Sequence, residues 1–335
     1  MKVLVTGGAG FIGSHACLEL LKANHKIHII DDFSTGSMQT IDRLIQISGK
    51  DIPYTKQNIL DTPKIIKIFK KFQPDVVIHF AGFKSVAESI SNPVAYYKNN
   101  ISGSISLLDA MSQTKCNKII FSSSATVYGK PDYLPIDENH KTKPKNPYGH
   151  SKLMVEKIIK DWTKNDDKRG SVILRYFNPV GAHKSGLHGE YVKGVPNNLM
   201  PFLSQVCAGI HDSINIYGND YDTEDGTGKR DYIHILDLAT AHAKSINFLD
   251  VNKGFSIFNI GTGIAYSVLE MIDVMEKVTN TKIQTKVCER RNGDFAEVWA
   301  DPTNANERLS WKAKFNINDM CLDAWNWQIK SFDQK

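Results

Sequence analysis

A tyrosine and a lysine four residues apart, Tyr148 and Lys152, have the spacing best suited to acid–base chemistry in this chain. Pro147 precedes a run of apolar residues at helical spacing, and proline is tolerated at the first position of a helix. Both side chains should therefore lie on one face of that helix. A free phenol has a pKa of about 10, and a neighbouring ammonium favours the phenolate and lowers that pKa. Tyr148 is predicted to be a general base whose pKa Lys152 lowers. Ser124 is predicted to pass a proton to or from a substrate hydroxyl.

A tyrosine four residues before a lysine is also common on ordinary solvated helices. The surrounding elements therefore have to show whether this pair is functional. The apolar run 3–5 leads into glycines at positions 7, 10 and 13, an amphipathic helical pattern follows, and a second apolar run, 26–30, ends at Asp31. The glycines permit a sharp turn and close approach to a pyrophosphate, whose charge the helix N-terminus favours. Asp31 can accept from an adenosine ribose and would repel a 2′-phosphate, so NAD is predicted over NADP. The alternative is an ordinary turn between a strand and a helix.

Three further apolar runs, 75–80, 118–121 and 172–177, are expected to be strands of the same parallel sheet. They end in small or polar residues, at the edge where a doubly wound sheet opens toward its ligand. We expect His79, within the first of these runs, to be a hydrogen-bonded strand residue rather than a base. The fold class predicted is α/β, a Rossmann-type doubly wound parallel sheet with a smaller C-terminal α/β lobe.

Length and composition support two structural units. The chain has 335 residues, long for a single core, and we place an NAD-binding unit at 1–177 and a substrate-binding lobe at 178–335. The net charge of +5 is modest and its lysines are scattered, so no nucleic-acid partner is indicated. Five well-separated cysteines favour reduced thiols over disulfides or a zinc site. The chain shows no signal-peptide pattern and no apolar stretch long enough to span a bilayer, so a cytoplasmic protein without a membrane partner is expected.

The motifs together amount to a family resemblance. The glycine loop, the segments 80–82 and 122–124, and the pair Tyr148 and Lys152 resemble an extended short-chain dehydrogenase/reductase. More specifically, three segments resemble the UDP-glucose 4-epimerase family, namely 124–129 (SATVYG), 175–181 (RYFNPVG) and 223–234 (TEDGTGKRDYIH). The similarity covers essentially the whole chain. Related sugar-nucleotide 4,6-dehydratases carry an acidic pair where this chain has Ala125 and Thr126, so the resemblance implies oxidation and re-reduction without elimination.

The resemblance implies an NAD-dependent isomerase that interconverts UDP-glucose and UDP-galactose with a cofactor that stays bound. Tyr148 would remove the proton from the sugar 4-hydroxyl, directly or through Ser124, while the C4 hydride passes to NAD. The transient 4-keto sugar would then turn over in the pocket and receive the hydride on its other face. Lys152 would bond the nicotinamide ribose and hold Tyr148 anionic. The family is usually dimeric through helices of its NAD-binding domain, so a homodimer is expected.

The same resemblance implies which residues line the two ligands, and it implies no metal ligand. The cofactor would be lined, besides the catalytic residues Ser124, Tyr148 and Lys152, by Gly7, Gly10, Phe11, Ile12, Gly13, Asp31, Asp32, Phe33, Ser34, Thr35, Gly36, Asn58, Ile59, Phe80, Ala81, Gly82, Phe83, Lys84, Asn99 and Phe177. The UDP-sugar would be lined by Lys84, Ser124, Tyr148, Asn178, Asn198, Leu199, Asn215, Ile216, Tyr217, Arg230, Arg291, Asp294 and Val298. Arginine suits a diphosphate because its planar fork can bond two oxygens. The alternative for each arginine is a surface salt bridge.

Two positions depart from the family pattern. Asn58 stands where an Asp usually meets the adenine amino group, and because an amide can still accept, we expect a mild effect on NAD binding. Val298 stands where glucose-specific forms often carry a bulky Tyr beside the sugar 2-position. Our hypothesis is that the smaller side chain also admits UDP-GlcNAc and UDP-GalNAc. The opposing interpretation is that neighbouring side chains fill the space.

Other functions remain to be separated from this one. A UDP-glucuronate 4-epimerase or an NAD-dependent sugar-nucleotide dehydrogenase could use the same fold, and a dehydrogenase would release NADH steadily. A non-catalytic NAD-sensing or scaffold protein is a rival of another class. Fold alone does not decide between these functions, so the decision rests on the residues of the site. The presence of Ser124, Tyr148 and Lys152 argues against a non-catalytic protein.

Overall fold

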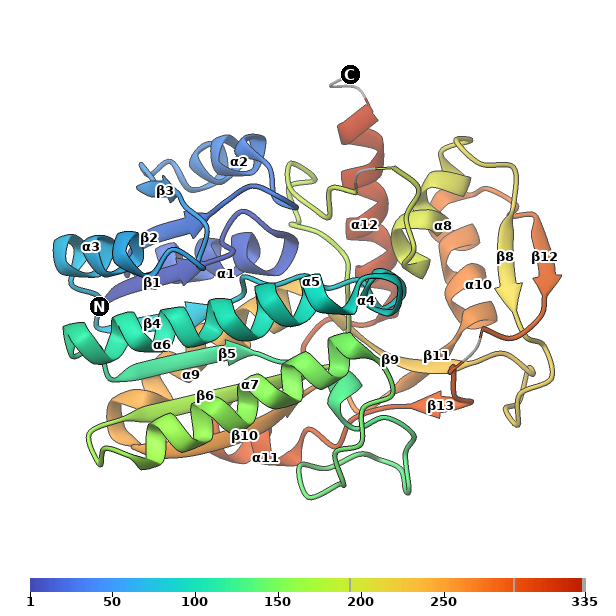
Figure 1. Ribbon diagram of the computed structural model, residues 1–335. Coiled ribbons are helices and arrows are strands. Elements are labelled where there is room, and N and C mark those ends of the chain that lie inside the picture. Colours follow the sequence, from blue (N-terminus) through green and yellow to red (C-terminus); the bar gives the residue numbers. More distant parts are fainter. Residues whose placement is uncertain (193, 292, 333–335) are drawn as a thin grey trace.

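Seven parallel strands form the central sheet of the computed structural model, which describes residues 1–192, 194–291 and 293–332 (Figure 1). The strand order is β10-β6-β5-β4-β1-β2-β3, so the order reverses between β1 and β4. A ligand crevice is expected at such a reversal, outside the carboxyl ends of the strands. The strands are β1 (Lys2–Thr6), β2 (Lys26–Asp31), β3 (Tyr54–Lys56), β4 (Val76–His79), β5 (Lys118–Ser122), β6 (Gly170–Tyr176) and β10 (Gly254–Ile260). The predicted doubly wound α/β class is confirmed.

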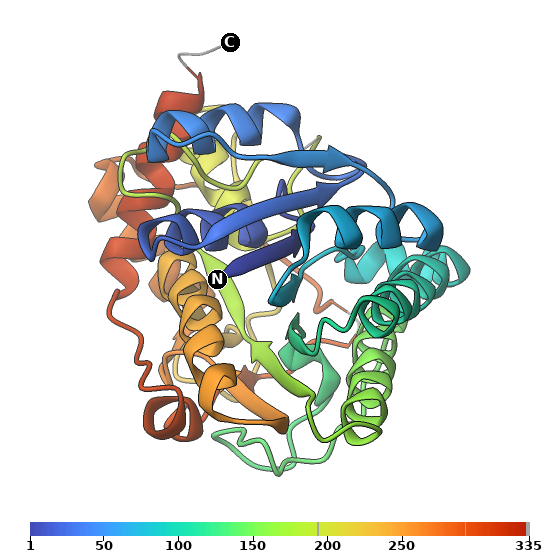
Figure 2. The same cartoon turned by 90° about the vertical axis from the view of Figure 1, so that its left-hand side faces the viewer.

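Helices cover both faces of this sheet, as the end-on view shows (Figure 2). Alternate residues of a strand point to opposite faces, and β1 follows this rule: Val3 and Val5 belong to one buried cluster and Leu4 to the other. The first cluster includes residues of α1 (Phe11–Lys22), α2 (Met38–Ser48), α9 (Ile235–Val251) and α11 (Thr303–Arg308). The second includes residues of α3 (Thr62–Phe72), α6 (Gly103–Thr114) and α7 (Pro147–Lys164).

Short helical segments lead from β4 into α6 and follow β5. After β4 come α4 (Val86–Ser91), α5 (Pro93–Tyr97) and a π-helical turn at Lys98–Ser102. A 3₁₀ turn at Ala125–Val127 follows β5. Both regions therefore lie just beyond the carboxyl ends of central strands, where the site is expected.

The C-terminal lobe contains two small sheets and three helices, on the right in Figure 1. β9 (Lys229–His234) pairs with β7 (Asn178–Val180), β11 (Ala265–Ser267) and β13 (Glu297–Val298), and β8 (Ile214–Tyr217) pairs with β12 (Thr285–Cys288). The helices α8 (Leu199–Cys207), α10 (Val268–Thr279) and α12 (Ile317–Phe332) share one apolar cluster with these sheets. This arrangement agrees with the predicted smaller α/β lobe.

The chain crosses between the two parts more than once. β10 and α9 follow residue 177 in sequence, yet β10 is an edge strand of the central sheet and α9 packs against α1. The division into 1–177 and 178–335 therefore stays a prediction. All five cysteines are free thiols. Within the described residues, no helix is long and apolar enough to cross a membrane, and no cluster of three His, Cys, Asp or Glu side chains could hold a metal ion.

Candidate active site

The glycine loop between β1 and α1 packs so closely that side chains would not fit. A Cβ on Gly7, which has φ +71°, would lie 2.5 Å from the Ala81 nitrogen, and a Cβ on Gly13 would lie 2.3 Å from the Gly7 oxygen. Gly10 begins α1 without a side-chain cap. The first-turn amides of α1, which have no partner within the helix, are therefore left for a ligand beside the end of β4. This cradle fits a pyrophosphate.

Asp31 holds the loop from the end of β2. One carboxylate oxygen accepts from the Ala9 amide at 2.9 Å and the other from the Phe33 amide at 2.8 Å, and the residue is 7% exposed. Burial raises the pKa of Asp31, and the two amides oppose that rise by stabilising the carboxylate. Each carboxylate oxygen can accept a second bond, so Asp31 fits the ribose-binding role predicted for it.

Asn58 is turned toward Asp32. Its amide nitrogen donates to the Asp32 carboxylate at 2.7 Å, and its side-chain oxygen accepts from the Leu60 amide at 2.9 Å. Asp32 also accepts from both the amide and the hydroxyl of Ser34. An Asp at position 58 would instead put two carboxylates in contact. An asparagine at position 58 is therefore compatible with the Asp32 carboxylate beside it. One acceptor lone pair of its amide oxygen remains for an adenine amino group.

The segment after β4 forms the opposite wall of the crevice. The Asn100 side chain accepts from the Phe83 amide at 2.8 Å and donates to the Phe83 carbonyl at 3.1 Å and to Ser151 on α7. Sequence reasoning missed this residue, although Asn99 beside it was predicted. Lys84 binds Glu190 of the C-terminal lobe at 2.6 Å, so its ammonium is turned toward the loop that follows β7. Asn100 thus fixes the wall that the family resemblance assigns to the cofactor.

Helix α7 begins as the sequence predicts. Pro147 is its first residue, and the side chain of Asn146 caps it by accepting from the Gly149 amide at 2.8 Å. Gly149 faces Thr126 and Pro144, and a Cβ there would lie 3.0 and 2.9 Å from their atoms. This close approach brings the first turn of α7 against the segment that follows β5.

Ser124, Tyr148 and Lys152 come together at this contact, and all three are buried. Burial and Tyr176 raise the pKa of the Tyr148 phenol, and the nearby Ser124 hydroxyl opposes that rise. The Lys152 ammonium donates to the Ser122 carbonyl at 2.8 Å and lies 5.9 Å from the centroid of the Tyr148 ring. The structure therefore places the predicted catalytic residues within one buried cluster.

The lowered pKa predicted for Tyr148 is wrong for the protein without cofactor. Burial raises the pKa of the phenol well above its usual value, and Tyr176 beside it raises it further. The ammonium of Lys152 is bonded to a carbonyl rather than to the phenol, and burial lowers its own pKa to about 8. Desolvation outweighs the lysine because both groups lie out of water, so a further positive charge has to favour the phenolate.

His79 is a hydrogen-bonded strand residue, as predicted. Its two ring nitrogens contact the Thr6 hydroxyl at 2.7 Å and the Ser104 hydroxyl at 2.9 Å. Burial lowers its pKa to about 3, so the ring is neutral at physiological pH.

The predicted substrate residues gather in the C-terminal lobe. Arg230 on β9 donates to the Phe295 carbonyl at 2.8 Å and lies 3.4 Å from Asp294. The Arg291 guanidinium stacks 3.9 Å from the centroid of the Tyr217 ring. A hydrogen bond from Asn215, and then one from Arg291, lower the pKa of the Tyr217 hydroxyl. Arg230 is thus held by a backbone carbonyl as well as by an ion pair, and the exposed Arg291 stacks on the Tyr217 ring.

The predicted substrate residues differ in how much of the side chain is exposed to a ligand. The Ile216 side chain is 4% exposed within the lobe core, so only its backbone can meet a ligand. Asn178 and Asn198 are exposed at the starts of β7 and α8, and Leu199 is half-buried beside Asn198. Val298 on β13 is half-buried and packs with a cluster that contains Phe177. The structure thus shows local contacts among these residues, with Val298 in register with Arg230 and Arg291 stacked on Tyr217, and excludes a side-chain role only for Ile216.

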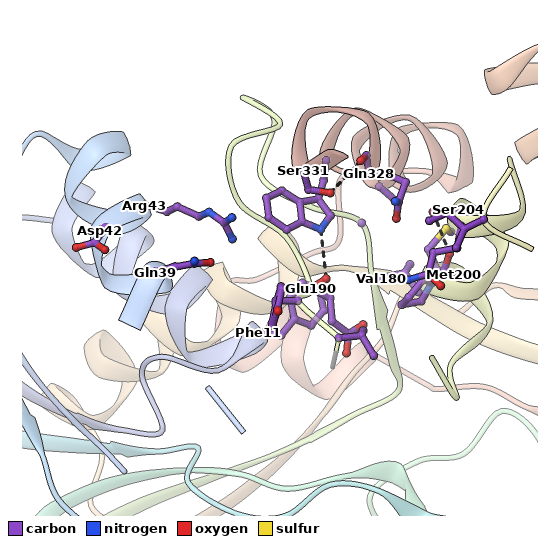
Figure 3. Close-up of a pocket in the computed structure, with 18 residues that line it drawn as sticks. Phe11, Gln39, Asp42, Arg43, Val180, Glu190, Met200, Ser204, Gln328 and Ser331 are labelled. Carbon is purple, nitrogen blue, oxygen red and sulfur yellow. Dashed lines mark hydrogen bonds between the residues drawn. The ribbon is translucent and has the colours of Figure 1, made fainter. Parts of the chain in front are cut away.

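A separate cavity of about 400 Å³ lies between α2, α8 and α12 (Figure 3). Arg43 and Gln39 of α2 face Ser331 and Gln328 of α12 across it, and the Arg43 guanidinium lies 4.7 Å from the centroid of the Trp327 ring. Phe11 is the only predicted site residue in its lining. This cavity is therefore not where the predicted chemistry lies.

We predict that Asp31→Asn weakens NAD binding at least about tenfold and reduces discrimination against NADP, because charge-assisted hydrogen bonds are the stronger ones. The NAD content of the purified protein and titration with both cofactors measure this. Asp42→Asn, on the exposed face of α2, is the matched control. Equal NAD content and equal discrimination in the two variants would contradict the role of Asp31.

Comparisons with known proteins agree with this geometry. Residues 4–324 match a family model described as GDP-mannose 4,6 dehydratase. A human UDP-glucose 4-epimerase is 48% identical over 98% of this chain and 96% of its own length. The UDP-glucose 4-epimerase of Stenotrophomonas maltophila, solved with NAD and formylated UDP-arabinopyranose, superposes with a TM-score of 0.98 at 42% identity over all of both chains. That of Bifidobacterium longum, solved with NAD+ and UDP, gives 0.95 at 44% identity, also over all of both chains. The chain belongs to the UDP-glucose 4-epimerase family.

Proposed function

We propose that this chain catalyses the reversible 4-epimerisation of UDP-glucose and UDP-galactose through a transient 4-keto sugar and tightly bound NAD. The observation that carries the proposal is the buried cluster of Ser124, Tyr148 and Lys152 at the open edge of a sheet whose glycine loop fits a pyrophosphate. The relatives described above, two of them solved with NAD, support it.

Tyr148 exchanges a proton with the sugar O4, either directly or through the nearby Ser124 hydroxyl. Bound NAD supplies the acceptor and donor of the C4 hydride, together with a positive charge on its nicotinamide. Lys152 holds a second positive charge on the same face of α7. Because burial raises the pKa of Tyr148, both charges are needed to favour the phenolate at neutral pH.

The lobe residues hold the nucleotide while the sugar turns over. Arg230 and Arg291 present guanidinium groups suited to a diphosphate, and the neighbouring ring of Tyr217 suits a nucleoside base. The binding energy is then placed away from C4, which leaves the 4-keto sugar free to present either face.

Elimination is disfavoured at the position where dehydratases carry an acidic pair. Ala125 and Thr126 occupy it in this chain, and the Thr126 hydroxyl contacts the Ser124 hydroxyl at 2.9 Å. Neither side chain is acidic enough to protonate a leaving hydroxyl. This favours epimerisation over the dehydratase activity that the family model's description names.

The first experiment uses the protein as purified, with no cofactor added. Incubation with UDP-galactose is expected to form UDP-glucose without accumulation of NADH. Tyr148→Phe is expected to lower kcat by about 10²–10⁴-fold with its NAD content unchanged, since only the proton-transferring group is lost. No conversion even with NAD supplied, or a steady rise of NADH, would overturn the proposal. The rise of NADH would favour the dehydrogenase.

We further propose that Val298 lets the pocket accept UDP-GlcNAc and UDP-GalNAc. Val298 lies in register with Arg230 on β9 and packs near Ala125 and Phe177, where a larger side chain would take up space. Val298→Tyr is expected to reduce turnover of UDP-GalNAc at least about tenfold while UDP-galactose turnover stays within a few-fold, a loss typical of steric exclusion from a pocket. Val251→Tyr, at an exposed end of α9, is the control. Failure of the unaltered protein to convert UDP-GalNAc would disprove the broader specificity.

A homodimer through α6 and α7 is also proposed. Ile105 on α6 is 49% exposed and Met154 on α7 is 44% exposed, and apolar side chains on two adjacent helices favour a buried interface. The double substitution Ile105→Lys and Met154→Lys is expected to give a monomer by light scattering. Leu322→Lys, on an equally exposed residue of α12, should leave the mass unchanged. A wild-type protein of monomer mass would contradict the interface.

We place the enzyme in the cytoplasm, where its free cysteines would stay reduced.

A further inference from the structure

A buried ion pair lies one helical turn behind Lys152. Glu156 on α7 and Arg175 on β6 are 3% and 4% exposed, and the guanidinium bonds both carboxylate oxygens, at 2.6 Å from Nη2 and 3.0 Å from Nε. Neither residue was singled out as a functional residue by the sequence analysis. Buried charges are rare unless they are paired, so the pair needs a role that explains its place.

Glu156 is joined to the catalytic segment. The Ser123 hydroxyl donates to a Glu156 oxygen at 2.5 Å, and the Ser122 carbonyl accepts from Lys152 at 2.8 Å. Ser124, the next residue, lies near Tyr148. Lys152 and Glu156, four residues apart on one face of α7, therefore hold the consecutive residues Ser122 and Ser123.

Arg175 anchors this arrangement from the other side. Its Nη1 donates to the Tyr128 hydroxyl at 3.1 Å, and that hydroxyl donates to Asn259 on β10 at 2.6 Å. The Asn259 amide in turn donates to the Ile136 carbonyl at 2.8 Å. The pair is thus part of a connected polar network that reaches the edge strand of the sheet, which restricts the geometries open to Glu156.

We propose that Glu156 and Arg175 are positioning residues, which fix the Ser122–Ser124 segment and let the Glu156 carboxylate keep Lys152 in its ammonium form. The inference rests on the proposed epimerase function, because that chemistry requires the positive charge of Lys152. Neither residue is assigned a contact with the reacting atoms.

The groups around Lys152 leave Glu156 as the source of negative charge. On α7 the ammonium has Tyr148 and Glu156 as titratable neighbours, and β4 contributes His79, which is neutral. β6 contributes Arg175, which is paired with Glu156, and Tyr176, which lies beside Tyr148. β5 contributes the Phe121 ring, 4.8 Å away, and the Ser122 carbonyl. Burial lowers the pKa of Lys152, and Glu156 opposes that effect.

The test is the substitution Glu156→Gln, which keeps the shape of the side chain and removes its charge. Arg175 then keeps its positive charge without the carboxylate that paired with it one helical turn from Lys152, so the ammonium becomes less favourable. We expect the alkaline fall of kcat to move to lower pH by about one unit, which is about tenfold in activity at a pH on that slope. The titration of Lys152 itself, followed by NMR of methylated lysines in the cofactor-free protein, should move in the same direction.

Two further variants separate positioning from simple stability. Removing both charges, in Glu156→Gln with Arg175→Met, should return the pH profile toward that of the wild type. Asp237→Asn removes another buried carboxylate, one that accepts the Lys314 and Phe315 amides at 2.9 and 3.0 Å, and should lower Tm without moving the profile.

The outcomes are distinguishable. If Glu156→Gln lowers Tm but leaves both the profile and the Lys152 titration in place, as Asp237→Asn should, the pair is only structural and the proposal is overturned. It is equally overturned if the double variant folds, retains NAD and keeps the shifted profile. An inactive wild type would count against the epimerase function instead, and the NMR titration would still decide the effect of Glu156 on Lys152.

Discussion

Burial of a phenol and an ammonium side by side is the constraint on which the rest of this site depends. Out of water both groups favour their neutral forms, and the pKa shifts of Tyr148 and Lys152 follow that rule. An active tyrosine base therefore cannot be produced by the tyrosine–lysine spacing alone. It needs positive charges nearby. The Lys152 ammonium, which Glu156 favours, is one, and a cationic nicotinamide would be another.

The parts of the fold that could be predicted from sequence depend on local backbone geometry. Gly7 and Gly13 are the residues that a tight strand–helix turn requires. Pro147 after Asn146 correctly predicts the first residue of α7. Asp31 could be found because the end of a parallel strand has a fixed place relative to that turn. Ser124, Tyr148 and Lys152 could be proposed as catalytic residues from their spacing and motifs before their contacts were known.

What could not be predicted depends on contacts between segments far apart in the chain. β10 joins the central sheet from beyond residue 250, and no local pattern distinguishes such a strand from one of the lobe. Asn100, 17 residues from the loop it fixes, and Asn58, 26 residues from Asp32, act through side-chain hydrogen bonds between distant segments. The shift of Tyr148 was missed because desolvation is a property of the packed site and not of the helix.

The junction between sheet and lobe shows why substrate specificity also lies beyond local patterns. Asp231 on β9 is fully buried, and its carboxylate accepts from the Thr262 and Gly263 amides after β10 and from the Ala300 amide after β13. One side chain thus ties the edge strand of the sheet to the two strands that carry Arg230 and Val298. In the proposed function the diphosphate meets Arg230 and the sugar C4 meets Tyr148, so this junction sets the distance between the two ends of the proposed ligand site. The specificity proposed for Val298 therefore depends on the joined sheet and lobe, and not on the lobe alone.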